Sequence, residues 1–183
     1  MLPSRNFYLS IMFTLLIWAG ALLSIPIDPV PLTFQTAVIF LAAFLLPMNY
    51  ALFSVVLYIV LGVLGLPVFS GGRSGVEVLY GPTGGFIFGF ILITFIISRL
   101  TRKVRYGAYS APQFWAAAWP CIVATIILQL CGMLWGKFNT EQPWTIILEN
   151  WLYPFYINMV VKVIIATVVA VYVWKMFPES KES

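Results

Sequence analysis

The segment from Pro29 to Gly72 contains no charged residue. At about 1.5 Å per residue, a continuous helix of this length would be far longer than the roughly 30 Å hydrocarbon core of a bilayer. The chain must therefore turn back within the segment, and Pro47-Met48-Asn49 is the natural place for the turn. The segment predicts two membrane spans, at about 32–46 and about 49–64.

Composition extends this interpretation to the whole chain. Of its 183 residues, 62% are hydrophobic and 9% are charged, and the mean hydropathy is +0.98. These values are typical of membrane proteins. Further apolar segments predict spans at about 7–24, 84–99, 113–136 and 155–175, with a kink at Pro120 in the fifth. We expect an all-α integral membrane protein in which residues 1–183 form a single six-helix domain.

The first span has some features of a secretory signal peptide, since Arg5 precedes it and Ala19-Gly20-Ala21 resembles a cleavage site. We expect this span to be retained, because more spans follow at once and no soluble domain would be exported. Ala19, Gly20, Ala21 and Ser24 are small residues suited to a close helix contact. That contact lies either within the bundle or with a partner membrane protein.

The distribution of positive charge predicts the orientation, because lysine and arginine concentrate on the cytoplasmic side of membrane proteins. With both termini in the cytoplasm, that side holds seven of these residues: Arg5, Arg99, Arg102, Lys103, Arg105, Lys175 and Lys181. The opposite side holds Arg73 and Lys137. The run RLTRKVR is then a topology determinant that also offers contacts to lipid headgroups or a partner. The loops at 25–33, 65–84 and 137–153 lie together on the outer face.

Several functions are disfavoured by residues that are missing. The chain has no histidine, no HExxH or GxSxG motif and no pair of intramembrane aspartates, so an intramembrane enzyme is not expected. Cys121 and Cys131 are interpreted as packing residues, and the pI of 9.2 reflects topology rather than nucleic-acid binding. We expect no metal and no cofactor in this chain. It also lacks ATP-binding motifs, so active transport would draw its energy from a partner or from ion coupling.

The stretch GLPVFSGGRSGVEVLYGPTGG, from Gly65 to Gly85, combines many glycines with an arginine and a glutamate. It lacks the lysine and the spacing of a phosphate-binding P-loop. Glycines permit positive φ angles and close approach of backbone amides, so the stretch predicts a lid over a ligand, with Arg73 available to an anionic group. The alternative is a flexible external loop without a ligand. Gly85 and Gly89 form a GxxxG motif that favours helix packing over ligand contact.

Lys162 is the most informative single residue, because an ammonium group inside a membrane is costly unless it is paired or hydrated. Asn158 lies four residues earlier, so both side chains project from one helix face. Alternatively, the lysine reaches an interface along its aliphatic stem. Thr33, Gln35 and Thr36 lie just below the outer surface, either as ligand contacts or as interhelical hydrogen-bonding groups. A small polar cluster under an external lid predicts the binding of one small solute.

The motifs IPIDPVPLTFQT (25–36), GLPVFSGG (65–72) and GPTGGFIFGF (81–90) resemble the BioY family, the substrate-binding S components of biotin transporters of the energy-coupling factor (ECF) type. The resemblance extends from the first span to the last. It implies six membrane helices in a bacterial inner membrane and binding of biotin from outside. It also implies a partner module of one membrane T component and two ABC ATPases, which use the ATP.

The resemblance also implies which residues bind the substrate. The glycine-rich loop would close over the ligand, the first loop and second span would line one side, and the last helix would supply a lysine. The residues concerned are Thr33, Gln35, Gly71, Gly72, Arg73, Tyr80, Thr83, Asn158 and Lys162.

The last-helix motif departs from the family pattern. The family usually has PFLPGDLIK, whereas this chain has PFYINMVVK from Pro154 to Lys162. Met159 stands at the aspartate position and Asn158 at the glycine position. Asn158 offers an amide oxygen as a substitute acceptor, and Asp28, where threonine is commoner, offers a carboxylate from the first loop.

We therefore expect a high-affinity, membrane-embedded biotin-binding S component that delivers the vitamin to an ECF ATPase module. One alternative is an S component for another small vitamin, which the missing aspartate leaves open. The other is a membrane assembly protein without a transport function, whose external loop engages a partner protein.

Overall fold

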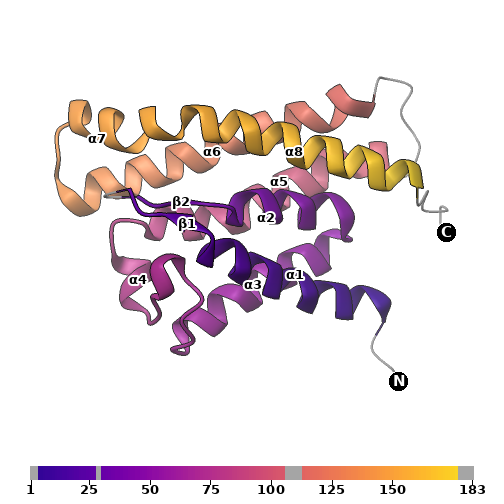
Figure 1. Cartoon of the computed structure of the whole chain (residues 1–183), viewed down its shortest axis with the longest axis horizontal. Helices are drawn as coiled ribbons and strands as arrows, with labels where there is room; N and C mark the ends of the chain where they lie inside the picture. Colours follow the sequence, from indigo (N-terminus) through magenta and orange to yellow (C-terminus); the bar gives the residue numbers. More distant parts are fainter. Residues whose placement is uncertain (1–3, 28–29, 106–112, 177–183) are drawn as a thin grey trace.

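The computed structural model describes residues 4–27, 30–105 and 113–176, and most of these are helical (Figure 1). The α-helices are α1 (Arg5–Leu22), α2 (Gln35–Leu45), α3 (Met48–Val63), α4 (Glu77–Tyr80), α5 (Gly84–Arg105), α6 (Gln113–Thr140), α7 (Trp144–Trp151) and α8 (Tyr156–Met176). Two short antiparallel strands, β1 (Ser24–Ile25) and β2 (Leu32–Thr33), form a hairpin between α1 and α2. Single 3₁₀ turns occur at Ser70–Gly72 and Tyr153–Phe155.

Each of the six predicted spans contains a helix, but the number of membrane crossings stays a prediction. Among the described residues, four helical segments are long and apolar enough to cross a bilayer: α1, α5, α6 and the segment from α7 to α8. The helices α2 and α3 have 11 and 16 residues, or about 16 and 24 Å at 1.5 Å per residue. The sequence did not predict α4 or α7, and α6 continues through Pro120.

The short helix α2 occupies the centre of the bundle. It packs against α1, α3, α5 and α8, and its side chains from Ile39 to Phe44 are mostly buried (Figure 1). Because α2 is much shorter than a bilayer is thick, its first residue, Gln35, lies inside the molecule. The interior space above this helix start is where a ligand could be enclosed.

Hydrogen bonds from neighbouring helices hold the other end of α2. The last carbonyl groups of a helix have no partner within it. Here the Ser98 hydroxyl of α5 donates to the carbonyl oxygen of Ala43 at 3.0 Å, and the Trp174 indole of α8 donates to that of Phe44 at 3.2 Å. These two bonds fix α2 against both α5 and α8.

A close contact at Gly20 sets the position of the start of α2. The backbone N–H of Phe34 donates to the Gly20 carbonyl at 3.0 Å. A Cβ atom on Gly20 would lie 3.0 Å from the backbone nitrogen of Gln35, which leaves no room for a side chain. Gly20 and Ala21 are buried inside the bundle, whereas Ala19 is exposed. The close contact is therefore internal to this protein at Gly20 and Ala21.

The GxxxG motif of α5 is a packing face, as predicted. A Cβ atom on Gly85 would overlap Trp135 and the carbonyl of Cys131 on α6, and one on Gly89 would lie 2.7 Å from a methyl group of Leu128 on α6. The absence of side chains at these two positions lets α5 and α6 pack closely.

The loops predicted to share one face do gather at one end of the bundle. Figure 1 shows the β1–β2 hairpin, α4 and α7 together at the left-hand end, whereas α1 begins and α8 ends at the right. The connection at 106–112 and the charged tail with Lys181 lie outside the described residues, so the charge bias is only partly described.

The Gly20 contact predicts a position-specific effect on stability. We expect Gly20→Leu to destabilise the protein by about 1–3 kcal/mol, because an added side chain would force α2 away from α1. The matched control, Ala19→Leu, is next in sequence but exposed, and it should stay within about 0.5 kcal/mol of the wild type. Thermal unfolding in detergent measures both variants. Equal effects would contradict the assigned contact.

Candidate functional site

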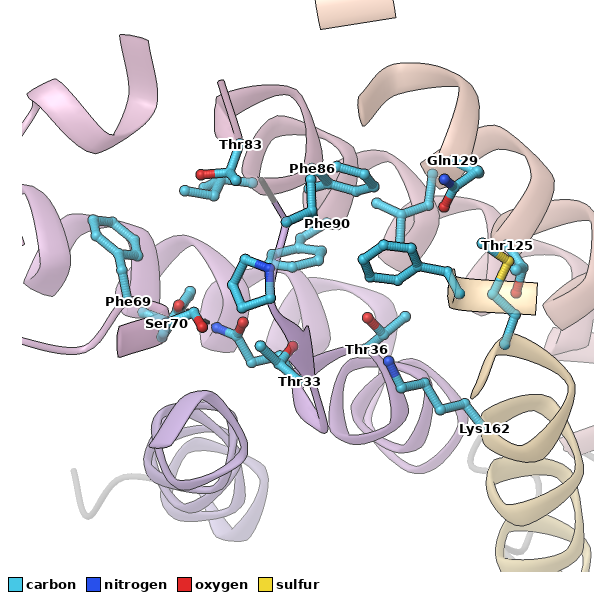
Figure 2. Close-up of a pocket in the computed structure, with 18 of the residues that line it drawn as sticks. Thr33, Thr36, Phe69, Ser70, Thr83, Phe86, Phe90, Thr125, Gln129 and Lys162 are labelled. Carbon is cyan, nitrogen blue, oxygen red and sulfur yellow. Dashed lines mark hydrogen bonds between the residues drawn. The ribbon is translucent and has the colours of Figure 1, made fainter. Parts of the chain in front are cut away.

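A pocket lies between the start of α2, the glycine-rich loop and helices α3, α5, α6 and α8 (Figure 2). The space between these walls, with the open mouth included, amounts to about 790 Å³. Aromatic rings and aliphatic groups form much of the wall. The polar lining residues are Thr33, Gln35, Thr36, Tyr58, Ser70, Arg73, Thr83, Thr125, Gln129 and Lys162.

Gln35 and Tyr58 form a hydrogen-bonded pair in one wall. The amide nitrogen of Gln35 donates to the Tyr58 hydroxyl oxygen. Both side chains are almost fully buried, and the Tyr58 ring packs edge-to-face on Phe69 with 5.6 Å between centroids. Since Tyr58 accepts from Gln35, its own proton is available to another partner. The pair therefore presents an amide oxygen and a hydroxyl donor at fixed positions, beside Thr33 from β2.

The glycine-rich loop makes a tight turn beside the pocket, and its role as a lid stays a prediction. Gly71 and Gly72 have φ angles of 73° and 70°, a region that glycine adopts without strain. The N–H of Phe69 bonds the carbonyl of Arg73 at 3.0 Å across the turn. The two glycines are exposed and form the turn rather than the lining. Ser70 faces the pocket, and its buried hydroxyl has no hydrogen-bond partner in the described part of the chain.

The cation of the lid lies at the mouth of the pocket. Arg73 is exposed but contributes to the lining, and its Nε donates to the carbonyl of Ser70 at 3.1 Å. This bond leaves the two terminal nitrogens of the guanidinium group for a ligand.

Both ends of the lid are anchored to helices. On one side the Trp18 indole donates to the carbonyl of Pro67 at 3.2 Å. On the other, two α6 side chains hold the backbone: the Trp135 indole bonds the Gly81 carbonyl at 2.9 Å, and the Asn139 amide bonds the Tyr80 carbonyl at 2.6 Å. Thr83 lines the pocket just after these anchors, whereas the Tyr80 side chain is 69% exposed and lies outside the lining.

Lys162 is buried in the opposite wall and remains only 8% exposed. Figure 2 shows its ammonium group pointing into the pocket toward Thr36 on α2, so the side chain does not extend to a membrane interface. No acidic residue occurs in the described lining, and the structure shows no ion pair for Lys162 with any described residue. The pocket thus contains a buried positive charge that an anionic or strongly accepting group would stabilise.

The residue before Met159 does not reach the pocket. Asn158 is partly buried outside the lining, and its amide oxygen is buried without a hydrogen-bond partner among the described residues. Met159 lines the pocket instead, next to Lys162. Asp28, the other proposed source of an acceptor, lies outside the described residues.

Four polar lining residues were not singled out from the sequence: Tyr58, Ser70, Thr125 and Gln129. Tyr58 gave no signal, because one tyrosine in a membrane span is common. Thr125 and Gln129 did give one. They stand four residues apart in a strongly apolar helix, a spacing that places two polar side chains on one face.

Residues 1–179 match the sequence model of the BioY family. The chain belongs to the BioY family. It is 37% identical over 146 residues to the biotin transporter BioY2 of Lactococcus lactis subsp. cremoris, a match that covers 80% of this chain and 77% of that protein. It is also 49% identical over 97 residues to the biotin transporter BioY of Thermotoga maritima, over 53% and 57% of the two chains.

A solved structure has the same fold. The S-component for biotin from an ECF-type ABC transporter superposes on this BioY chain with a TM-score of 0.84 and 26% sequence identity, covering 93% of this chain and 91% of that one. Together with the apolar helices, these similarities make the chain a multi-pass membrane protein of a transporter family rather than an enzyme.

The unpaired ammonium of Lys162 predicts a gain in stability when it is removed. We expect Lys162→Met to stabilise the ligand-free protein by at least about 1 kcal/mol, because the methionine keeps the aliphatic stem and removes a charge buried in an apolar surrounding. The control, Lys175→Met, changes an exposed lysine on the same helix and should have little effect. Thermal unfolding without ligand measures the difference. A destabilised Lys162→Met protein would show that the ammonium has a stabilising partner.

Proposed function

We propose that this protein is a biotin-binding S component that takes the vitamin from outside the cell and delivers it to an ECF ATPase module. The family assignment supports biotin uptake, and the pocket supports direct binding by this chain. The observation that carries the proposal is the enclosed pocket with the buried, unpaired Lys162, because nothing in the fold itself requires a charge at that position.

The pocket suits the chemistry of biotin. The bicyclic rings and aliphatic chain of biotin match the apolar walls, among them Phe86 and Phe90. Its ureido group and carboxylate require donors and acceptors at separate positions, and the polar lining residues are divided between the lid side and the Lys162 side (Figure 2). The proposed substrate-binding set consists of Thr33, Gln35, Arg73, Thr83 and Lys162 as lining residues. Gly71 and Gly72 form the lid turn, and Tyr80 and Asn158 lie at the periphery.

The partners are proposed from the family. A T component and two ABC ATPases would supply docking and energy, with no ATP site in this chain. We also propose that both termini are cytoplasmic and that the end carrying α4, α7 and the hairpin faces outward. The asymmetry of lysine and arginine supports this orientation.

Isothermal titration of biotin into the purified protein, in detergent and without partner subunits, tests the proposal. We expect tight binding of one biotin per chain and no displacement by riboflavin or thiamine. Saturable binding of another vitamin, but not of biotin, would support the alternative of a different substrate, which the acid-free lining leaves open. If folded protein bound none of these compounds, a receptor role for all three would be ruled out.

The two cations should differ in their effect on biotin affinity. Lys162→Met should weaken binding by about 100-fold or more, because the ligand loses a charge-assisted hydrogen bond in a buried site. Arg73→Gln should weaken it by about fivefold or less, since solvent screens an exposed charge at the mouth. Titrations at low and high salt provide the check, with a salt-dependent effect expected at Arg73 only. The reverse order of the two effects would contradict the assigned positions.

A further inference from the structure

The polar groups around Lys162 come from three helices. Figure 2 shows the Lys162 ammonium of α8 beside Thr36 of α2, with Thr125 and Gln129, one turn apart on α6, in the same part of the pocket; Met159 of α8 also contributes to the lining. Hydroxyl groups, an amide and an ammonium group therefore line this part of the pocket, and no carboxylate occurs in the described lining. Their remaining hydrogen-bonding capacity defines what this end can bind.

Gln129 is oriented by a bond outside the pocket. Its amide nitrogen donates to the backbone carbonyl of Trp151, which can only accept, so the nitrogen must face that way. Trp151 is completely buried: it stacks on Phe86 and fills the space beside Gly136. The planar amide cannot turn without losing this bond. Its oxygen has no donor among the described residues and remains a fixed acceptor in the lining.

Thr125 is also limited to accepting. Its hydroxyl donates to the carbonyl of Cys121, one turn earlier on α6, at 2.7 Å. With the proton engaged in the helix, only the lone pairs of the oxygen face a ligand. Lys162, by contrast, has donors only. Helices α6 and α8 thus supply two acceptors and one cationic donor here, beside the Thr36 hydroxyl of α2.

We propose that Thr125 and Gln129 accept the two N–H groups of a cyclic urea whose carbonyl oxygen is bound by Lys162. The inference rests on the proposed function and deepens it, because the ureido ring of biotin has two N–H donors flanking one carbonyl acceptor. The two neutral acceptors on α6 make a carboxylate at the Met159 position unnecessary. The acid chain of the ligand then extends toward the mouth of the pocket, where Arg73 lies.

Specificity follows from the cost of an unmet hydrogen bond. A buried site built to accept two N–H groups discriminates strongly against a ligand that lacks one of them. Biotin methylated on a single ureido nitrogen removes one donor and leaves the rest of the molecule unchanged. The two positional isomers of N-methylbiotin therefore report separately on the two acceptors.

The test is isothermal titration of biotin and both N-methylbiotins into the full chain and its variants, in detergent. For the wild type we expect each methylated ligand to bind at least about tenfold more weakly than biotin. Thr125→Val should reduce this penalty to about twofold for one isomer, and Gln129→Met should do so for the other. Thr125→Ser keeps the hydroxyl and should retain the wild-type ratio of the affinity for biotin to the affinity for each N-methylbiotin.

A matched control is available on the same helix. Thr140 makes the same type of bond, to the carbonyl of Gly136 at 2.7 Å, but lies outside the lining, so Thr140→Val should leave both ratios unchanged. If Gln129→Met does not fold because Trp151 loses its partner, the Thr125 variants still decide. Variants that weaken the binding of biotin and of both methylated ligands by the same factor would overturn this proposal. The proposed biotin binding itself would still stand. A wild-type protein that binds no biotin would overturn both.

Discussion

Within a membrane, a polar side chain has to find its hydrogen-bond partners inside the protein, and this requirement distinguishes the scaffold of this bundle from its pocket. In the scaffold several hydroxyl groups donate to backbone carbonyls. Thr14 donates to those of Ser10 and Ser54, and Thr94 donates to that of Phe90. In the pocket the Ser70 hydroxyl and the Lys162 ammonium are without partners among the described residues. Ser70 and Lys162 are thus unpaired where a solute would sit, whereas the other buried polar atoms without a partner among the described residues, such as Asn158 Oδ1 and Thr167 Oγ1, lie outside the pocket lining.

The position of this pocket depends on helix α2. Because α2 is short and enclosed by four neighbours, its first residue, Gln35, is buried in the interior of the bundle. The Gly20 contact determines where that helix begins, and bonds from Ser98 and Trp174 hold the other end. The same helix therefore carries part of the binding wall and connects it to α5 and to α8, which bears Lys162.

Much of this could be predicted from the sequence, for physical reasons that differ between elements. Long uncharged segments locate helices well, because few other structures bury so many consecutive apolar residues. The burial of Lys162 and the lid turn at Gly71 were also accessible, since a charge in an apolar span and glycines in a polar loop are unusual. The pairing of Gln35 with Tyr58 could not be predicted from the sequence, because it joins two helices through their side chains. Gln129 could have been noticed as a polar residue in an apolar helix, but its role depends on the Trp151 carbonyl, which sequence does not locate.

The anchors of the glycine-rich loop affect how long a bound solute would stay in the pocket. Trp18 holds the loop before the turn, and Trp135 and Asn139 hold it after the short helix α4. Between these anchors the Gly75 N–H also bonds the Gly62 carbonyl of α3 at 2.8 Å, and Phe69 is buried against Tyr58. A solute that left past this loop would have to break these contacts together, and the height of that barrier would determine how long an occupied molecule keeps its ligand.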